Sequence, residues 1–549
     1  MKRIRSRKKG AVLGSLVLAA WLVSSCGTMG PTEAPDLIAG QSPGKTPDEV
    51  GFDSILDVQP SIVYYQIFVR SFYDSNGDGI GDLKGIEEKL DYLSDLGVQG
   101  IWLTPIQPSP SYHGYDITDY YSINPQFGTM DDCQHLIQEA HKRRIKVIMD
   151  LVVNHTSSKH PWFLDSAADK ISPHRNWYTW QEGLDAYNSG EQSATGGSAW
   201  HKKGSDSYLG VFSEGMPDLN FDNPDVRHEL VQVGQFWLKL GFDGFRLDAA
   251  KHVYDDLKSS SGSQEIAAKN QAWWQEFRKG LNEVNPDAYL VGEVWDSASV
   301  AAPYVNHAFN STFDFDLNKT LRTIVSSEQT EDLAELVKRS YQPFYQESGG
   351  SFVDATFLGN HDMDRVMSSF NGNLEHAKMA AALLLTLPGN PFVYYGDEIG
   401  MQGRGADENK REPMLWSESE KGQGQTTWEP ILSNRGRSRP SVEVQRKDPD
   451  SLWNFYKNLI DLRKKEPALR DGDIGSYEVN TPGVVSYLRM TDHETVLVLH
   501  NISGKKLTVT LNHRSTDAFN QLSFSTNTEA ALADNNVTLP PYSTVVLKP

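Results

Sequence analysis

The sequence predicts an α/β fold, a (β/α)8 TIM barrel with a small subdomain inserted after the third strand and an antiparallel β-sandwich at the C-terminus. Four widely spaced apolar strands each end in polar residues, as in barrels that build a site at the carboxyl ends of their strands. The pattern breaks between about His155 and Phe221, where tryptophans lie among many Ser, Gly and Asp residues. After about Asp471 the chain changes to short alternating strands.

At 549 residues the chain is too long for one ordinary domain, and a barrel with a smaller domain fits it. A structureless loop as long as the broken region is unusual in a compact domain, so we expect a subdomain there. The predicted parts are a signal peptide (1–25), a flexible tether (26–52), a first part of the barrel (53–154), an inserted subdomain (155–221), a second part of the barrel (222–471) and the β-sandwich (472–549).

The N-terminus has the composition of an export signal. Basic residues without acids precede an apolar run at 11–23, which is too short for a typical membrane-spanning helix. Val23–Cys26 resembles a bacterial lipobox, whose cysteine is acylated and becomes the new N-terminus. We therefore expect an exported, extracytoplasmic protein that is lipid-anchored to the cell membrane surface through Cys26. An ordinary secretory signal and an uncleaved anchor are the alternatives.

The net charge and the cysteine content exclude some classes of protein. A formal net charge of −20 argues against nucleic-acid binding and suits an uncharged substrate and cations. Besides Cys26 the chain has only Cys133, which lies in an amphipathic segment and is expected to be a buried thiol. The sequence therefore contains no disulfide framework.

The period of the apolar residues predicts the elements in order. The first elements are expected at 62–69, 84–96, 100–104, 129–144 and 146–153. After the insertion a helix is expected to begin at Asn223-Pro224 and to end at Gly241. Later barrel elements are expected at 263–284, 289–294, 313–315, 329–340, 354–358, 374–387, 391–395 and 452–464, and sandwich strands at 484–490, 495–500 and 507–511.

The chain is organised around a short strand that ends in Arg246 and Asp248. These two side chains are two residues apart, so they leave the same face of the strand. A buried acid beside a fixed cation stays ionised, which suits a nucleophile. A purely structural Arg–Asp pair is the alternative. Three other apolar strands end in polar residues and favour a catalytic site, and these residues are Asp150, Asn154, His155, Glu293, Asn360, His361 and Asp362.

These four stretches resemble, in the same order, the four signature regions of the α-amylase family of glycoside hydrolases. Met216–Asn220 resembles a fifth region that distinguishes subfamilies, and it indicates an intermediate subfamily. The resemblance extends from about Ser61 to the C-terminus. It implies that Asp248 is the nucleophile of a retaining reaction, Glu293 the general acid/base and Asp362 the third carboxylate.

The resemblance also implies residues that bind the sugar. Tyr115 matches an aromatic platform, and Asp116 and Arg411 match a pair at the non-reducing side. Lys251 and His252 match residues that line the leaving-group side. The complete predicted set is Tyr115, Asp116, His155, Arg246, Lys251, His252, His361 and Arg411.

Calcium is the expected cofactor. Oxygen ligands recur at Asp74, Asn76, Asp78 and Asp82, with a carbonyl expected at Ile80, and this loop resembles the calcium loop after the first strand of many family members. It is not an EF-hand, because Gly85 replaces the bidentate Glu, and a solvated Asp/Gly turn is the alternative. Asn154, Asp218 and the His252 carbonyl match part of a second site between the barrel and the insertion.

Together, the residues and the resemblance predict a monomeric, mainly endo-acting α-amylase that cleaves α-1,4 bonds in starch and maltooligosaccharides. Ala249, the residue after the predicted nucleophile, is small where oligo-1,6-glucosidase-like relatives often carry Val. An exo-acting oligo-1,6-glucosidase or α-glucosidase and a glucan transglycosylase are the alternatives within the family. A non-catalytic transporter subunit is the alternative outside catalysis, and the three carboxylates argue against it.

Overall fold

The computed structural model describes residues 61–254, 256–419, 421–436, 440–511 and 519–549, all within one compact unit, Ser54–Pro549. The predicted signal peptide, the tether and Cys26 lie outside the described residues. Within the described ranges, no helix combines the length and the apolar character needed to cross a membrane.

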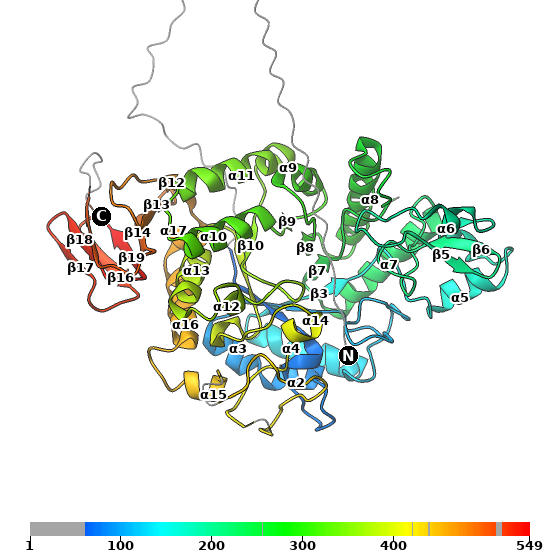
Figure 1. Cartoon of the computed structure of the whole chain (residues 1–549), viewed down its shortest axis with the longest axis horizontal. Coiled ribbons are helices and arrows are strands. Elements are labelled where there is room, and N and C mark those ends of the chain that lie inside the picture. Colours follow the sequence, from blue (N-terminus) through cyan, green and yellow to red (C-terminus); the bar gives the residue numbers. More distant parts are fainter. Residues whose placement is uncertain (1–60, 255, 420, 437–439, 512–518) are drawn as a thin grey trace, which may run out of the picture. The chain divides into compact units, whose positions relative to one another are not determined.

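Eight parallel strands form a closed barrel, which confirms the predicted fold class (Figure 1). Their order around the ring is β10 (Ala355–Phe357), β11 (Asn390–Tyr394), β1 (Tyr64–Ile67), β2 (Gly100–Leu103), β3 (Lys146–Leu151), β7 (Gly244–Leu247), β8 (Tyr289–Gly292) and β9 (Ser311–Thr312). A parallel bridge between Phe313 and Ala355 joins the two ends of this order and closes the ring. Because all strands run the same way, their carboxyl ends meet at one rim.

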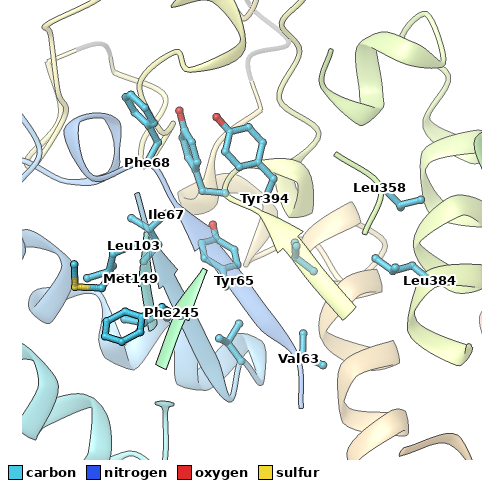
Figure 2. Close-up of a cluster of buried hydrophobic side chains, with 14 of the residues drawn as sticks. Val63, Tyr65, Ile67, Phe68, Leu103, Met149, Phe245, Leu358, Leu384 and Tyr394 are labelled. Carbon is cyan, nitrogen blue, oxygen red and sulfur yellow. The ribbon is translucent and has the colours of Figure 1, made fainter. Parts of the chain in front are cut away.

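Alternate residues of the strands fill two different cores. Tyr64, Trp102 and Phe392 pack inside the barrel, where the Tyr64 and Phe392 rings stack with centroids 4.7 Å apart. Their chain neighbours Tyr65 and Leu103 belong to the core outside the barrel, which Figure 2 shows together with Leu384 of a surrounding helix. The strands are therefore buried on both faces, and this explains their continuous apolar sequences.

The helices outside the strands are α2 (Leu83–Glu88), α3 (Leu90–Leu96), α4 (Met130–Lys142), α7 (Pro224–Leu240), α8 (Gln264–Asn282), α10 (Phe315–Ser327), α11 (Leu333–Ser348), α13 (Leu374–Thr386) and α16 (Leu452–Lys465). Helix α7 begins as predicted, with Asn223 capping the N–H of Asp225, and it ends at Gly241, whose φ is 120°.

Two element predictions were wrong. The helix expected over 84–96 is interrupted at Lys89, so that α2 and α3 are separate. The barrel element expected at 313–315 is divided: strand β9 occupies Ser311–Thr312, Phe313 makes the bridge to Ala355, and Phe315 begins helix α10. The carboxylate of Asp314 accepts a hydrogen bond from the N–H of Leu317, so this acid is the N-cap of α10.

The inserted region forms a small subdomain after β3. Its sheet has the order β4 (Trp180–Gln181), β6 (Asp206–Leu209) and β5 (Trp200–Lys203), and it is accompanied by the helices α5 (Pro161–Ala168) and α6 (Asp185–Ser189). All pairings in this sheet are antiparallel.

The C-terminal region consists of two antiparallel sheets. One has the order β12 (Asp473–Ser476), β13 (Val484–Met490), β14 (Thr495–Asn501), β19 (Ser543–Lys548) and β16 (Gln521–Ser525), and the other β15 (Leu507–Thr510), β18 (Asn536–Leu539) and β17 (Ala531–Ala533). Leu497 of the first sheet and Val537 of the second share one buried apolar cluster.

Candidate active site

Three carboxylates surround the guanidinium of Arg246 inside the rim of the barrel. Its Nη1 lies 2.5 Å from Asp150 Oδ1 and 2.5 Å from Asp248 Oδ1, and its Nη2 lies 2.8 Å from Glu293 Oε2. Arg246 and Asp150 are register partners on β7 and β3, while Asp248 and Glu293 follow the ends of β7 and β8. The structure therefore places the predicted nucleophile and the predicted acid/base in contact with the same guanidinium.

Arg246 favours the ionised form of Asp248, as predicted, but burial has the larger influence on the pKa of this group. Burial raises the pKa of Asp248 to about 8, and although Arg246 opposes this shift, Glu293 and Asp150 add to it. Burial likewise raises the pKa of Asp150 to about 6. Since one cation cannot balance three buried carboxylates, the cluster retains a proton more readily than isolated carboxyl groups do, and it titrates as a unit.

Asp248 and Glu293 each have one carboxylate oxygen fixed by the protein. Asp248 Oδ1 is held by Arg246, and Glu293 Oε2 accepts from both Arg246 and the backbone N–H of Ala249 at 3.0 Å. Ala249 has a φ of 48°, in the left-handed region that favours glycine. In this backbone conformation the Ala249 N–H donates to Glu293 Oε2.

A buried hydrogen-bond chain supports the cluster. The Tyr115 hydroxyl lies 3.1 Å from Asp150 Oδ2 and 2.6 Å from His361 Nε2, and the Tyr115 and His361 rings stack with centroids 5.4 Å apart. Trp102 Nε1 donates to Asp150 at 2.9 Å, and Gln66 Nε2 lies 2.7 Å from His361 Nδ1. Burial, together with Arg411 and Arg246, lowers the pKa of His361 well below its usual value, so this ring is neutral.

Arg411 forms the wall beside the third carboxylate. Its Nη2 donates to Asp362 Oδ1 at 2.8 Å and to Asp407 of α14 (Asp407–Lys410) at 3.4 Å, and its Nη1 donates to the Tyr112 hydroxyl at 3.2 Å. Asp116, the other predicted member of the sugar-binding pair, accepts hydrogen bonds at its Oδ1 from Ser109 at 2.5 Å and also from Ser111. Tyr112, which was not among the predicted residues, contacts Arg411.

The remaining predicted sugar-binding residues line the same cavity, which has a volume of about 700 Å³. His155 Nε2 contacts the carbonyl of Tyr115 at 3.1 Å, and burial lowers the pKa of His155 to about 4. Lys251 Nζ donates to the carbonyl of Trp295 at 3.0 Å and to Asp296 at 2.8 Å. His252 Nδ1 lies 2.5 Å from Asp256 Oδ2.

Sequence reasoning missed several residues of the cavity. Phe212 of the insertion is 38% exposed and Trp295 is 48% exposed, and both line the cavity together with Asp407. Trp295 lies two residues beyond Glu293, and this was the one available signal for its position. Asp150 was recognised as a polar strand end, but its place under Arg246 follows only from the register of β3 against β7.

The residues of the first predicted calcium loop lie on a tight turn. Asp74 Oδ1 accepts from the N–H of Gly77 at 2.6 Å and its Oδ2 from the N–H of Gly79 at 2.7 Å. Asn76 and Asp78 are exposed on the same turn, and their Oδ1 atoms accept from the N–H groups of Asp78 and Ile80 at 2.9 and 2.8 Å. Oxygen donors of this kind fit a hard cation such as Ca²⁺.

The residues of the second predicted calcium site are buried. Asn154 Nδ2 lies 3.4 Å from Asp218 Oδ1, while the buried Asn154 Oδ1 has no hydrogen-bond partner among the described residues. Burial raises the pKa of Asp218 well above its usual value. An orphaned amide oxygen beside a buried carboxylate fits a cation. Over the described part of the chain, no three His, Cys, Asp or Glu side chains are grouped as metal ligands, so both sites would rely on amide or carbonyl oxygens as well.

Comparisons with known proteins agree with this geometry. Residues 66–472 match the family described as alpha amylase, catalytic domain, and residues 484–546 match the alpha-amylase SusG C-terminal domain. The chain is 41% identical to alpha-amylase 3 of Dictyoglomus thermophilum, over 88% of this chain and 93% of that protein. It is 33% identical to an oligo-1,6-glucosidase of Parageobacillus thermoglucosidasius, over 81% of this chain and 90% of that protein. The crystal structure of an alpha-amylase from H. orenii has a TM-score of 0.80 and 41% identity, and the match covers 89% of this chain and all of that one.

Proposed function

Because the chain belongs to the α-amylase family of glycoside hydrolases, we propose that it is a retaining, mainly endo-acting α-amylase that cleaves α-1,4-glucosidic bonds in starch and maltooligosaccharides. The observation that carries the proposal is that Asp248 and Glu293 share one guanidinium and line one cavity. A retaining glycosidase needs two such carboxyl groups, one as nucleophile and one as acid and base.

In the proposed reaction Asp248 attacks the anomeric carbon with Oδ2, the oxygen that Arg246 does not hold. Glu293 gives its proton to the glycosidic oxygen, so that the bond to the leaving sugar breaks while an ester to Asp248 forms. Glu293 then takes a proton from water, and the water oxygen displaces Asp248. Asp362, held by Arg411, accepts hydrogen bonds from sugar hydroxyls and stabilises positive charge on the ring.

Specificity for α-1,4 bonds rests on Ala249, which lines the cavity and leaves room beside the acid/base. Product analysis on soluble starch, maltotriose, pullulan and isomaltose tests the proposal. We expect maltooligosaccharides in the first minutes of starch digestion. An enzyme that cleaves isomaltose faster than maltotriose, or releases only glucose at first, would be an exo-glucosidase, and transfer products without hydrolysis would indicate a transglycosylase.

The cofactor in this proposal is calcium. The loop Asp74–Asp82 would hold one ion through Asp74, Asn76, Asp78, Asp82 and the Ile80 carbonyl, and Asn154, Asp218 and the His252 carbonyl would contribute to a second. When bound, these ions supply structural cross-links between loops, with no part in proton transfer.

We also propose that the protein is a monomer that is exported and anchored by acylated Cys26, on the basis of the N-terminal sequence. Membrane fractionation and mass spectrometry of the mature N-terminus test the anchor. Cys26→Ser should release or misprocess the protein. An unlipidated, soluble mature protein that begins elsewhere would contradict this proposal.

A further inference from the structure

A groove of about 590 Å³ lies on helix α10, next to the active-site cavity. We call it the α10 groove, and the residues that matter for its chemistry are Trp295, Phe315, Lys319, Arg322, Thr323 and Ser326. Trp295 lines both the cavity and the groove, so the two hollows meet at this ring.

Trp295 is held in place although its side chain is half exposed. Its ring stacks on Phe315 with centroids 4.5 Å apart and an interplanar angle of 12°. Lys251 Nζ donates to its carbonyl at 3.0 Å and thereby ties the backbone as well. A fixed, exposed aromatic face is a surface against which a sugar ring packs without ordering the protein first.

The wall of the groove carries hydrogen-bonding groups of both kinds, because the Lys319 ammonium is a donor, while the Thr323 and Ser326 hydroxyls donate to backbone carbonyls of α10 and can still accept. Lys319, Thr323 and Ser326 are exposed at a spacing that places them on one face of α10. Arg322 donates to Ser369, which lines the same groove. No carboxylate occurs among the described residues of this wall, in contrast to the acidic cavity. Ammonium, guanidinium and hydroxyl groups suit the hydroxyl oxygens of a neutral sugar chain.

We propose that the α10 groove binds the leaving-group end of a long α-glucan whose scissile bond lies between Asp248 and Glu293. The leaving-group end of the glucan is assigned to the groove because Glu293, which protonates the leaving oxygen, precedes Trp295 by two residues. Arg411 occupies the wall beside Asp362. This inference rests on the proposed function and adds a distal binding subsite to it.

The test uses the full chain and two groove variants. Ser326→Trp fills the groove, and Lys319→Ala with Thr323→Ala removes one donor and one hydroxyl acceptor from its wall. The matched control is Thr320→Ala, because the Thr320 and Thr323 hydroxyls both bond to the carbonyl four residues earlier, at 2.9 and 2.8 Å, but Thr320 does not line the groove. Thermal melting of each variant verifies that the fold is kept.

We expect both groove variants to raise KM for maltoheptaose by about threefold to tenfold, the scale of one or two lost hydrogen bonds, without a change for maltotriose. With maltoheptaose labelled at its reducing end, the labelled products should become shorter, because the leaving-group side binds fewer sugars. An unchanged ratio of kcat/KM for the two substrates and an unchanged product pattern in both variants would overturn the proposal.

Failure of the proposed function would look different, because the wild-type enzyme would then cleave isomaltose faster than maltotriose, release only glucose at first or give only transfer products. In that case the groove can still be tested by calorimetry of maltoheptaose binding, with the groove variants and the control made in the Asp248→Asn protein. The proposal holds if the groove variants weaken that binding and Thr320→Ala does not, and it is refuted if all four proteins bind alike.

Discussion

Replacing Arg246 with Met removes the cation that three carboxylates share while it keeps an unbranched side chain of similar length. The Arg246 side chain is 1% exposed, with nitrogens at 2.5, 2.5 and 2.8 Å from Asp150, Asp248 and Glu293. Breaking a buried ion pair by removing one partner typically costs about 3–5 kcal/mol, because the other charge stays buried without compensation. We expect the free energy of unfolding at pH 7 to fall by about that amount.

The loss should depend on pH in a defined direction. The pKa of Asp248 is raised to about 8, above a value of about 4 in an unfolded chain, so the native state binds a proton that the unfolded state lacks between these values. Asp248 therefore contributes to the free energy of unfolding at low pH, and this contribution is lost as the pH rises toward 8. Removing the cation raises the pKa of Asp248 further, so Arg246→Met should be destabilised more at pH 8 than at pH 5, which lies below the raised pKa values of Asp150 and Asp248.

Urea unfolding at pH 5, 7 and 8 measures this effect, and kcat/KM profiles should show an acid limb displaced to higher pH. Arg246→Lys is the matched control, since it keeps one charge but cannot reach all three acids with two nitrogens. A Met variant with the wild-type urea midpoint and the wild-type acid limb would refute the view that one guanidinium organises the site.

Three further predictions concern the nucleophile, the metal and the bond specificity. Asp248→Asn should keep less than about one hundredth of the wild-type turnover while it still binds maltooligosaccharide in calorimetry, and a higher residual rate would exclude Asp248 as the nucleophile. Chelation should lower the melting temperature and added calcium should restore it, with a smaller response in Asp78→Ala; an apo protein, verified as metal-free, that melts like the untreated one would count against the calcium loop. Ala249→Val should shift the rate ratio toward α-1,6 bonds by about tenfold, and it should also lower stability, because φ at this position is 48° and a β-branched side chain tolerates the left-handed region less well than Ala does. Rate ratios on isomaltose and maltotriose that match the wild type would contradict the role of Ala249.

The sequence predicts the barrel and the position of the carboxylates well, because strand ends are marked by a change from apolar to polar residues. Asp248, Glu293 and Asp362 all follow short buried strands, and parallel strands place their ends at one rim. The protonation of the cluster could not be derived in this way, since it depends on how many acids share Arg246 and how deeply they are buried.

The positions of loop side chains could not be predicted from the periodicity of the apolar residues. Tyr112 and Arg411 are 299 residues apart in the chain and meet at 3.2 Å, whereas Asp116, four residues after Tyr112, accepts from Ser109. No periodicity indicates which of several polar residues in a loop lies on the cavity wall. The α10 groove was missed for a similar reason, because its wall is a helix face that sequence alone marks only as solvent-exposed.

The hydrogen bonds beneath the site connect distant parts of the polypeptide. Gln66 and His361 are 295 residues apart, and Tyr115 and His361 are 246 residues apart. Contacts of such long range form late in folding, because the entropy of closing a long loop is lost before they are made. Hydrolysis regained during refolding should therefore report closure of the ring between β9 and β10, and it should lag behind the appearance of helical circular dichroism. Recovery of enzymatic activity therefore reports the time at which the barrel is complete.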